Sequence, residues 1–213
     1  MIEPASELLF TASAISKSFP GVQALAEVKF DLKEGEVHAL VGENGAGKST
    51  LSRIIAGAEI SDSGRMHFCG KPYQPRNRTD AESAGIRMIM QELHLIGNLS
   101  IAENILLNKL PNRFGIVDYK KLNRIAQEVM AEVGLGDIDP AMPVKLLGTG
   151  QQQLVEIAAG LSQKCRILIM DEPTASLTDT ETELLFTQIG KLKAEGVGII
   201  YISHRIEEII RIT

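Results

Sequence analysis

The sequence of 213 residues predicts an α/β protein with a largely parallel sheet. Short apolar runs bounded by Gly, Asn or Asp alternate with longer stretches whose apolar residues have helical spacing. Two of the runs, residues 166–170 and 197–203, are almost wholly apolar, as expected of strands that are covered on both faces. At roughly 100–200 residues per domain, the length fits one large domain or a core with a subdomain.

The predicted strands begin near the N-terminus, where runs over 8–15 and 28–32 lie on either side of the turn residues Pro20 and Gly21. A further run over 36–41 leads into a glycine-rich stretch and then into helical spacing over 49–56. The remaining predicted strands are 65–69, 86–90, 166–170 and 197–203.

The middle of the chain, from about His94 to Leu161, has helical spacing throughout. One helix is expected over 119–133, with Leu122, Ile125, Val129 and Val133 on one face. The other helices predicted in this stretch are 101–107 and 151–161.

This arrangement predicts a helical subdomain, about 94–161, inserted into a core made of 1–93 and 162–213. A last helix begins at Arg205 and reaches Thr213 without a C-cap signal. We expect a single domain whose end is either a frayed natural terminus or a cut through a longer protein.

Composition and charge exclude several classes of protein. Hydrophobic residues make up 44% of the chain and the net charge is −5, which argues against disorder and against a nucleic-acid clamp held by bulk electrostatics. Cys69 and Cys165 lie far apart and in no CxxC pattern, so neither a metal site nor a disulfide is expected. The apolar runs are far shorter than a membrane span, and the N-terminus lacks the basic region of a secretory signal. We expect a soluble, intracellular protein.

Residues 42–49 read Gly-Glu-Asn-Gly-Ala-Gly-Lys-Ser and match the phosphate-binding motif G-x-x-x-x-G-K-[ST] between a strand and a helix. Glycines let backbone N–H groups turn toward phosphate oxygens, and the helix N-terminus adds its positive dipole end. Lys48 can reach the β- and γ-phosphates, and the Ser49 hydroxyl can bind Mg²⁺. A chance match in a chain of this composition has a probability under about 1%, so the motif predicts nucleotide binding.

The apolar run 166–170 is followed by two carboxylates, Asp171 and Glu172. Side chains alternate along a strand, so the two point in different directions and can have different roles. Asp171 suits the Mg²⁺ site, and Glu172 suits polarising a water for attack on the γ-phosphate. The alternative is that both are solvated residues at the end of a strand, which the phosphate-binding loop makes the weaker interpretation.

At this point the sequence resembles a family, the ATPase subunits of ABC transporters, over nearly the whole chain from Phe19 to His204. Phe19 matches the aromatic residue that stacks on adenine, and Gln91 matches the Q-loop glutamine at the junction of core and helical subdomain. His204 matches the switch histidine that contacts the γ-phosphate. Residues 175–178 match the D-loop, and the signature is matched by Leu147, Gly148, Thr149, Gly150 and Gln151.

The resemblance implies a role for each of these positions. Catalysis is assigned to Glu172, His204 and Gln91, and metal binding to Ser49, Gln91 and Asp171. The nucleotide-binding residues are Phe19, Gly42, Glu43, Asn44, Gly45, Ala46, Gly47, Lys48, Ser49 and Thr50. The implied fold is a P-loop ABC core whose mixed sheet has antiparallel N-terminal strands and a parallel part, with an inserted α-helical subdomain.

Segments 17–22, 35–44 and 150–157 look like those of the ribose, xylose and galactose-type sugar importers. In that branch the ATPase is a tandem protein about twice this length, and this chain resembles its first half. The chain stops before the strands that normally follow the switch histidine, so the resemblance implies a single ABC domain truncated at its C-terminus. Two departures from the family pattern matter: the usual signature serine is Gly148, and the usual D-loop aspartate is Thr178. Glycine removes a hydroxyl that would touch the γ-phosphate of the opposing site.

These resemblances imply an ATPase that uses ATP and Mg²⁺ to power import of a pentose or hexose at the cytoplasmic face of the inner membrane. The implied partners are a second ABC half, membrane permease subunits and, through the permease, a sugar-binding protein, with no nucleic acid. An isolated half is expected to be weakly active, because each site needs the other half's signature. Gln91 and residues 93–101 lie where the family docks its permease, although Leu93, Leu95, Ile96, Leu99 and Ile101 could equally pack internally.

Two alternatives come from other classes. A soluble ABC ATPase acting on nucleic acid or ribosomes would be expected to carry long coiled-coil or basic insertions, which this sequence lacks. A P-loop kinase would need an acceptor site and would have no use for residues 148–153.

Overall fold

The computed structural model describes residues 8–43 and 45–213. The chain divides into two compact units, which are described separately. The core unit comprises the chain up to Met88 together with Cys165–Glu172 and Gly190–Thr213, and the helical unit comprises Ile89–Lys164 and Pro173–Ile189. The predicted helical segment, 94–161, falls within the helical unit.

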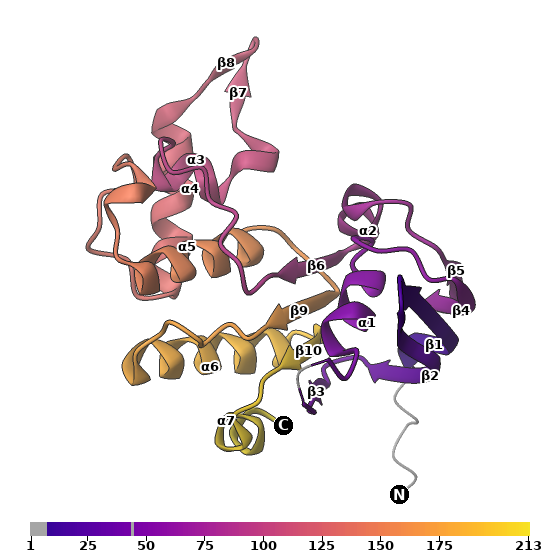
Figure 1. Cartoon of the computed structure of the whole chain (residues 1–213). Helices are drawn as coiled ribbons and strands as arrows, with labels where there is room; N and C mark the ends of the chain where they lie inside the picture. Colours follow the sequence, from indigo (N-terminus) through magenta and orange to yellow (C-terminus); the bar gives the residue numbers. More distant parts are fainter. Residues whose placement is uncertain (1–7, 44) are drawn as a thin grey trace, which may run out of the picture. The chain divides into compact units, whose positions relative to one another are not determined.

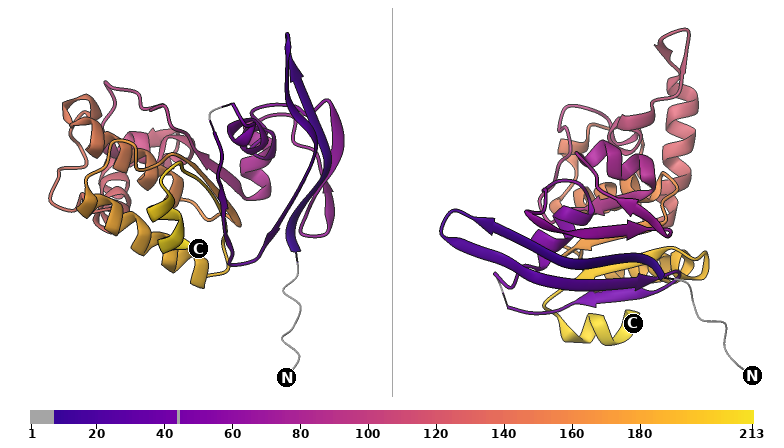
Figure 2. Two further views of the ribbon diagram at one scale, coloured as in Figure 1. Left: turned by 60° about the horizontal axis from the view of Figure 1, so that its bottom comes forward. Right: turned by 90° about the vertical axis from the view of Figure 1, so that its right-hand side faces the viewer.

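An antiparallel sheet forms the N-terminal part of the core unit. Its strands β1 (Leu8–Phe19), β2 (Val22–Lys33), β4 (Ser63–Phe68) and β5 (Lys71–Tyr73) lie in the order β2-β1-β4-β5. The long hairpin of β1 and β2 is drawn in indigo in Figure 2. Strands β1 and β2 are both longer than predicted. The register shifts along this pair, and Ala14 and Glu27 adopt positive φ within it. Such irregularities interrupt the apolar alternation on which the prediction depended.

A second sheet has the order β3-β10-β9-β6, with β3 at Val37–Leu40, β10 at Gly198–Ile202, β9 at Ile167–Asp171 and β6 at Ile86–Ile89. β10 pairs in parallel with β3 on one side and with β9 on the other. Every residue of β9 and β10 is buried, as their apolar sequence predicts. The predicted fold class is confirmed, and the antiparallel and parallel strands lie in separate sheets.

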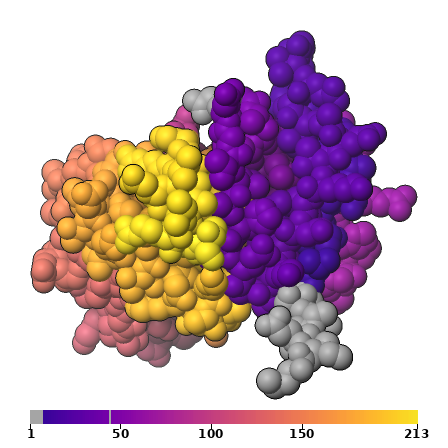
Figure 3. Space-filling view, turned by 90° about the horizontal axis from the view of Figure 1, so that it is seen from below, coloured from indigo at the N-terminus to yellow at the C-terminus, as the bar shows by residue number. Residues whose placement is uncertain are grey.

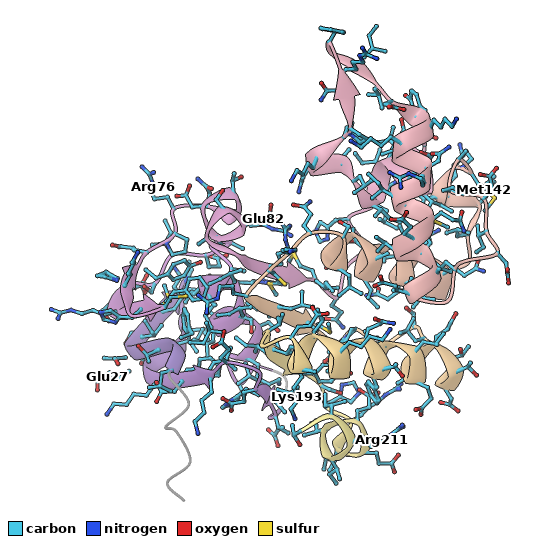
Figure 4. All side chains as sticks on the ribbon, turned by 180° about the vertical axis from the view of Figure 1, so that it is seen from behind. Glu27, Arg76, Glu82, Met142, Lys193 and Arg211 are labelled. Carbon is cyan, nitrogen blue, oxygen red and sulfur yellow. The ribbon has the colours of Figure 1, made fainter. Side chains whose placement is uncertain are left out.

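The helices that lie wholly within the described part of the core unit are α1 (Lys48–Ile55), α2 (Arg78–Ala84) and α7 (Ile206–Ile212). Helix α2 was not predicted because it is short and has one buried residue, although Asn77 caps it by accepting from the Asp80 N–H. Figure 4 labels Arg76 and Glu82 at the two ends of this region, and Figure 3 shows α7, in yellow, at the surface.

The helical unit contains α3 (Ile101–Ile105), α4 (Tyr119–Glu132) and α5 (Thr149–Leu161), with 3₁₀ turns at Leu107–Lys109 and Val144–Leu146. The buried face of α4 is formed by Leu122, Ala126 and Met130, and Val133 just beyond the helix is also buried. Ile125 and Val129 are only partly buried, so the predicted face is rotated by part of a turn.

The expectation that residues 94–161 are wholly helical is wrong. Two short strands, β7 (Asn112–Arg113) and β8 (Ile116–Val117), form a hairpin between α3 and α4 (Figure 1). Two residues per strand are too few to produce a detectable apolar alternation. The sequence analysis also missed α6 (Asp179–Ala194), whose apolar residues are spread around the helix.

No helix within the described residues is both long enough and apolar enough to cross a membrane.

Two glycines with positive φ test how closely β1 and β4 approach. A Cβ at Gly64 would lie 2.6 Å from the backbone oxygen of Ala14, whereas a Cβ at Gly70 would meet nothing within 4 Å. Gly64→Ala should therefore lose about 1–3 kcal/mol more stability than Gly70→Ala, because both share the positive-φ cost and only the first adds a clash. Urea unfolding of the two variants measures the difference. Equal losses would contradict the close backbone approach.

Candidate nucleotide-binding site

Three parallel strands lead to the phosphate-binding loop, Glu172 and His204 at one edge of the core unit's sheet. Leu40 of β3 and Asp171 of β9 are both paired with Ile202 of β10. The phosphate-binding loop follows β3, Glu172 follows β9, and His204 comes two residues after β10. In open α/β sheets the carboxyl ends of parallel strands form the usual ligand-binding edge.

The loop between β3 and α1 depends on glycine at several positions. Gly42, Gly45 and Gly47 have φ values of 153°, 87° and 83°. A Cβ at Gly47 would lie 2.5 Å from the Ala24 oxygen and 2.7 Å from Leu25 Cδ2, so the loop packs directly on β2. Asn44, predicted to bind nucleotide, lies outside the described residues.

Helix α1 begins at Lys48, and among the described residues no side chain caps its first N–H groups. The first N–H groups of a helix have no intrahelical partner, so those of Lys48, Ser49 and Thr50 can donate to a phosphate. The Lys48 ammonium donates to the carbonyl oxygens of Gly42 (2.6 Å) and Glu43 (2.9 Å). The cation is thereby held against the loop, which also contains Ala46.

Asp171 and Ser49 form the polar pair suited to a metal ion. The Ser49 hydroxyl donates to Asp171 Oδ1 at 3.4 Å, and Asp171 is only 5% exposed. Burial raises the pKa of Asp171 above its ordinary value, the hydrogen bond from Ser49 lowers it less, and the neighbouring charge of Glu172 raises it further. A buried carboxylate beside a hydroxyl is a donor set that fits Mg²⁺, which favours oxygen ligands and is commonly bound by one or two carboxylates together with phosphates.

Glu172 and His204 form a second pair at the same edge. His204 Nδ1 lies 3.3 Å from Glu172 Oε1, and the Glu172 N–H donates to the Ile202 oxygen at 3.0 Å. Glu172 has a φ of 46°, in the left-handed region that non-glycine residues rarely adopt. Such a conformation costs about 1–3 kcal/mol and persists where the surroundings enforce it, often at functional sites.

Phe19 lies at the end of β1 and is 40% exposed, with Lys17 Nζ 5.4 Å from its ring centroid. Asp62 holds this end of the hairpin, accepting from the Ser18 N–H at 2.7 Å and from Lys17 Nζ at 3.3 Å. The Ser18 N–H, and then Lys17, keep the pKa of Asp62 below its usual value. The sequence analysis missed Asp62, which lies 44 residues from Ser18 and belongs to no local motif.

The signature residues lie at the start of α5 in the helical unit. Gly148 is the N-cap, and its N–H donates to Gln151 Oε1 at 3.3 Å. A Cβ at Gly150, by contrast, would lie 2.9 Å from the Ser176 oxygen, so the signature helix lies directly against the D-loop. Leu147 is buried beneath the helix start, and Thr149 begins the helix.

Thr178, at the usual D-loop aspartate position, helps to begin α6. Its N–H and its hydroxyl each donate to Glu181 Oε2 at 2.8 Å, and the Glu181 N–H reaches the Thr178 hydroxyl at 3.4 Å. This reciprocal capping, in a T-x-x-E sequence, is the signal that could have revealed α6.

The predicted permease-docking segment is partly internal. Gln91 lies in a bend after β6 and is exposed; its catalytic and metal-binding roles stay predictions. Ile101 is fully buried, Ile96 is about half exposed, and the other three apolar residues, Leu93, Leu95 and Leu99, are intermediate. Asn104 fixes the segment by accepting from the Ile96 N–H and donating to the Ser100 oxygen.

Comparison with known families decides the identity of this arrangement. The family model described as "ABC transporter" matches residues 25–175. The chain belongs to the ABC transporter family. The matched region of this ABC domain includes the phosphate-binding loop and the Asp171–Glu172 segment.

Curated relatives carry importer names. A protein of Burkholderia cenocepacia described as "Putative ribose/galactose/methyl galactoside import ATP-binding protein 3" is 48% identical over 99% of this chain and 41% of its own length. "Arabinose import ATP-binding protein AraG" of Rhizobium meliloti is 44% identical over 93% of this chain and 39% of its own length. The ABC domain thus spans about two fifths of the length of the relatives it matches.

Solved structures share the fold of the ABC domain. The dimeric structure of a bacterial ABC transporter cassette matches with a TM-score of 0.83 and 24% identity, covering 95% of this chain and 90% of that chain. An ATP-binding cassette of an ABC transporter in its ADP conformation matches with a TM-score of 0.80 and 24% identity, covering 97% and 85%.

The raised pKa of Asp171 generates a pH-dependent prediction. The folded protein retains this proton at pH values where the unfolded chain has lost it, so this group makes stability fall as the pH rises from about 4 through the raised pKa. Asp171→Asn, without nucleotide or metal, should unfold at a higher temperature than the parent at neutral pH. The advantage should shrink toward pH 4.

Asp62→Asn provides the control of opposite sign. The pKa of Asp62 is lowered, so its contribution is present at neutral pH and is lost as the pH falls through the folded value. Thermal unfolding of both variants from about pH 2 to 8 covers both effects, since the Asp62 contribution is lost only below its ordinary pKa. An Asp171→Asn variant no more stable than the parent at neutral pH would contradict the cost of the buried carboxylate.

Proposed function

We propose that this ABC domain is the first half of a tandem ATPase that hydrolyses ATP with Mg²⁺ to power import of a pentose or hexose. The observation that carries the proposal is the edge of the core sheet, where the Lys48 loop, the Ser49–Asp171 pair and the Glu172–His204 pair converge. The sugar class is supported by relatives named for import of ribose, galactosides and arabinose.

The chain's own groups account for binding of the nucleotide. The N–H groups at the start of α1 and the Lys48 ammonium would receive the phosphates, with Lys48 exchanging its two carbonyl partners for phosphate oxygens. Phe19, exposed beside the Lys17 ammonium, would stack on the base. Ser49 and Asp171 would hold Mg²⁺, which neutralises the charge that develops on the β- and γ-phosphates.

Glu172 is the proposed general base. Its carboxylate would orient the attacking water and take a proton as the water oxygen bonds to the γ-phosphorus and the bond to the ADP oxygen breaks. His204, 3.3 Å from Glu172 Oε1, would fix the direction of this carboxylate. Gln91 is proposed to complete the site as a metal ligand.

The site is proposed to need a second ABC half, which would supply its signature to the nucleotide bound at Lys48. The signature of this chain, at the start of α5, would serve the nucleotide of that second half. Permease subunits would bind the two ABC halves at the cytoplasmic face of the membrane, and conformational change in the halves would be transmitted to them. A sugar-binding protein would deliver the sugar to the permease. Action on nucleic acid or ribosomes is the weaker alternative, because the chain is acidic and its relatives carry import names.

Binding and chemistry should separate in two variants. Lys48→Ala should weaken ATP binding by this chain, because it removes the ammonium that would contact the phosphates. Glu172→Gln should bind ATP but reduce turnover of the complete transporter by about 10²–10⁴-fold, since an amide cannot accept the proton. Nucleotide titration and phosphate release measure the two properties. Near-normal turnover with Glu172→Gln would show that the base is another group.

Hydrolysis by the isolated chain should be slow and should depend on pairing. Since two copies are needed to complete a site, the rate of phosphate release should rise with about the square of protein concentration at low occupancy of the dimer. Steady-state assays over a wide concentration range, with sedimentation to establish the oligomeric state, test this. Rapid hydrolysis by a strict monomer would contradict the two-half mechanism.

A further inference from the structure

The hairpin of β7 and β8 places an aromatic residue in a strained and solvated position. Asn112 pairs with Val117 and Arg113 with Ile116, which leaves Phe114 and Gly115 as a two-residue loop. Their φ values are 53° and 81°, a combination for which such loops usually carry Asn-Gly. A bulky residue at the first position is uncommon because its Cβ disfavours the left-handed region.

Few packing contacts with the rest of this unit offset the strained backbone of Phe114. Phe114 is 93% exposed and Ile116 is 76% exposed, and the Arg113 guanidinium lies 5.7 Å from the centroid of the Phe114 ring. Figure 1 shows the hairpin projecting beyond α3 and α4. The two largest apolar side chains of this hairpin therefore form an apolar tip (Phe114 and Ile116) that this unit does not cover.

Basic residues surround the apolar tip in the sequence. Residues 107–124 contain one acidic residue, Asp118, which is engaged in capping α4 by accepting from the Lys121 N–H at 3.0 Å. The whole chain, by contrast, has a net charge of −5, so positive charge is concentrated in this segment. The basic residues of the segment are Lys109, Arg113, Lys120, Lys121 and Arg124, of which Arg124 is paired with Glu128 at 3.5 Å.

We propose that the β7–β8 hairpin docks on an anionic lipid surface, with Phe114 and Ile116 entering the headgroup region and the surrounding cations contacting lipid phosphates. Aromatic and aliphatic side chains flanked by Lys and Arg are the combination that binds at membrane interfaces. The proposal rests on the proposed function, which brings this domain to the cytoplasmic face of a membrane.

Charge favours lipid over a loop of a membrane protein as the occupant. Cytoplasmic loops of membrane proteins carry an excess of Lys and Arg, which would repel the basic segment 107–124. The anionic lipids of the cytoplasmic leaflet attract such a segment.

The chain contains no tryptophan, so one introduced residue reports its own surroundings. Phe114→Trp should show blue-shifted emission with vesicles of phosphatidylcholine containing about one third phosphatidylglycerol, and little shift with phosphatidylcholine alone. The shift should decline as salt is added, because the surface attraction is screened. Ile60→Trp, at a site 58% exposed in the core unit, is the control and should not shift. Emission from Phe114→Trp that does not change with anionic vesicles would overturn the proposal.

A second variant separates membrane binding from folding. Phe114→Asn creates the Asn-Gly loop that this turn prefers, so thermal stability should be kept or raised while co-sedimentation with the anionic vesicles weakens roughly tenfold. Ile60→Asn should sediment like the parent. Equal sedimentation of Phe114→Asn and the parent would overturn the proposal, as would Phe114→Asn losing binding to solubilised permease but not to lipid. Neither experiment requires nucleotide, so a failure of lipid binding can be distinguished from a failure of the Lys48 and Glu172 tests of the proposed function.

Discussion

The pairing of β10 with β3 on one side and β9 on the other is the constraint on which the nucleotide site depends. Because Leu40 and Asp171 are both in register with Ile202, the loop after β3 and the carboxylates after β9 emerge at the same level of the sheet. A slip of one residue between β9 and β10 would turn Asp171 to the other face, because side chains alternate along a strand. The buried apolar residues of β9 and β10 fix this register far more strongly than the polar contacts beyond them could.

Burial of Asp171 lowers the stability of the folded protein at neutral pH, at the same edge where the carboxylate is proposed to bind a metal ion. The carboxylate is removed from water and receives one hydrogen bond, from Ser49, so its charged form is disfavoured in the protein alone. A divalent cation bound beside Asp171 would favour the charged carboxylate, because its positive charge would attract the negative oxygen atoms. The strained backbone of Glu172, which follows directly, is held by its N–H bond to Ile202 and so belongs to the same sheet edge. Site and sheet are therefore stabilised together.

Much of this could be predicted from the sequence because the relevant signals are local. The loop 42–49 and the apolar run before Asp171 each combine a strand with its functional residues in a few consecutive positions. Features that depend on distant partners could not be found, such as Asp62 holding Ser18 or the rotated buried face of α4. The helix α6 was missed because its apolar residues do not form a stripe, although Thr178 and Glu181 carried a capping signal.

The two glycines of the signature have different structural reasons, and of the two only Gly148 departs from the family pattern. A Cβ at Gly150 would strike the Ser176 oxygen, so glycine there is required by the packing of α5 against the D-loop. A Cβ at Gly148 would meet nothing within 4 Å, and its φ is negative, so the fold would accept serine without strain. The absence of the serine hydroxyl is therefore not a consequence of packing in this unit. Its effect must fall on whatever the start of α5 faces, which under the proposed function is the nucleotide of the second half. Thr178 differs again, because there the departure supplies a helix cap that begins α6.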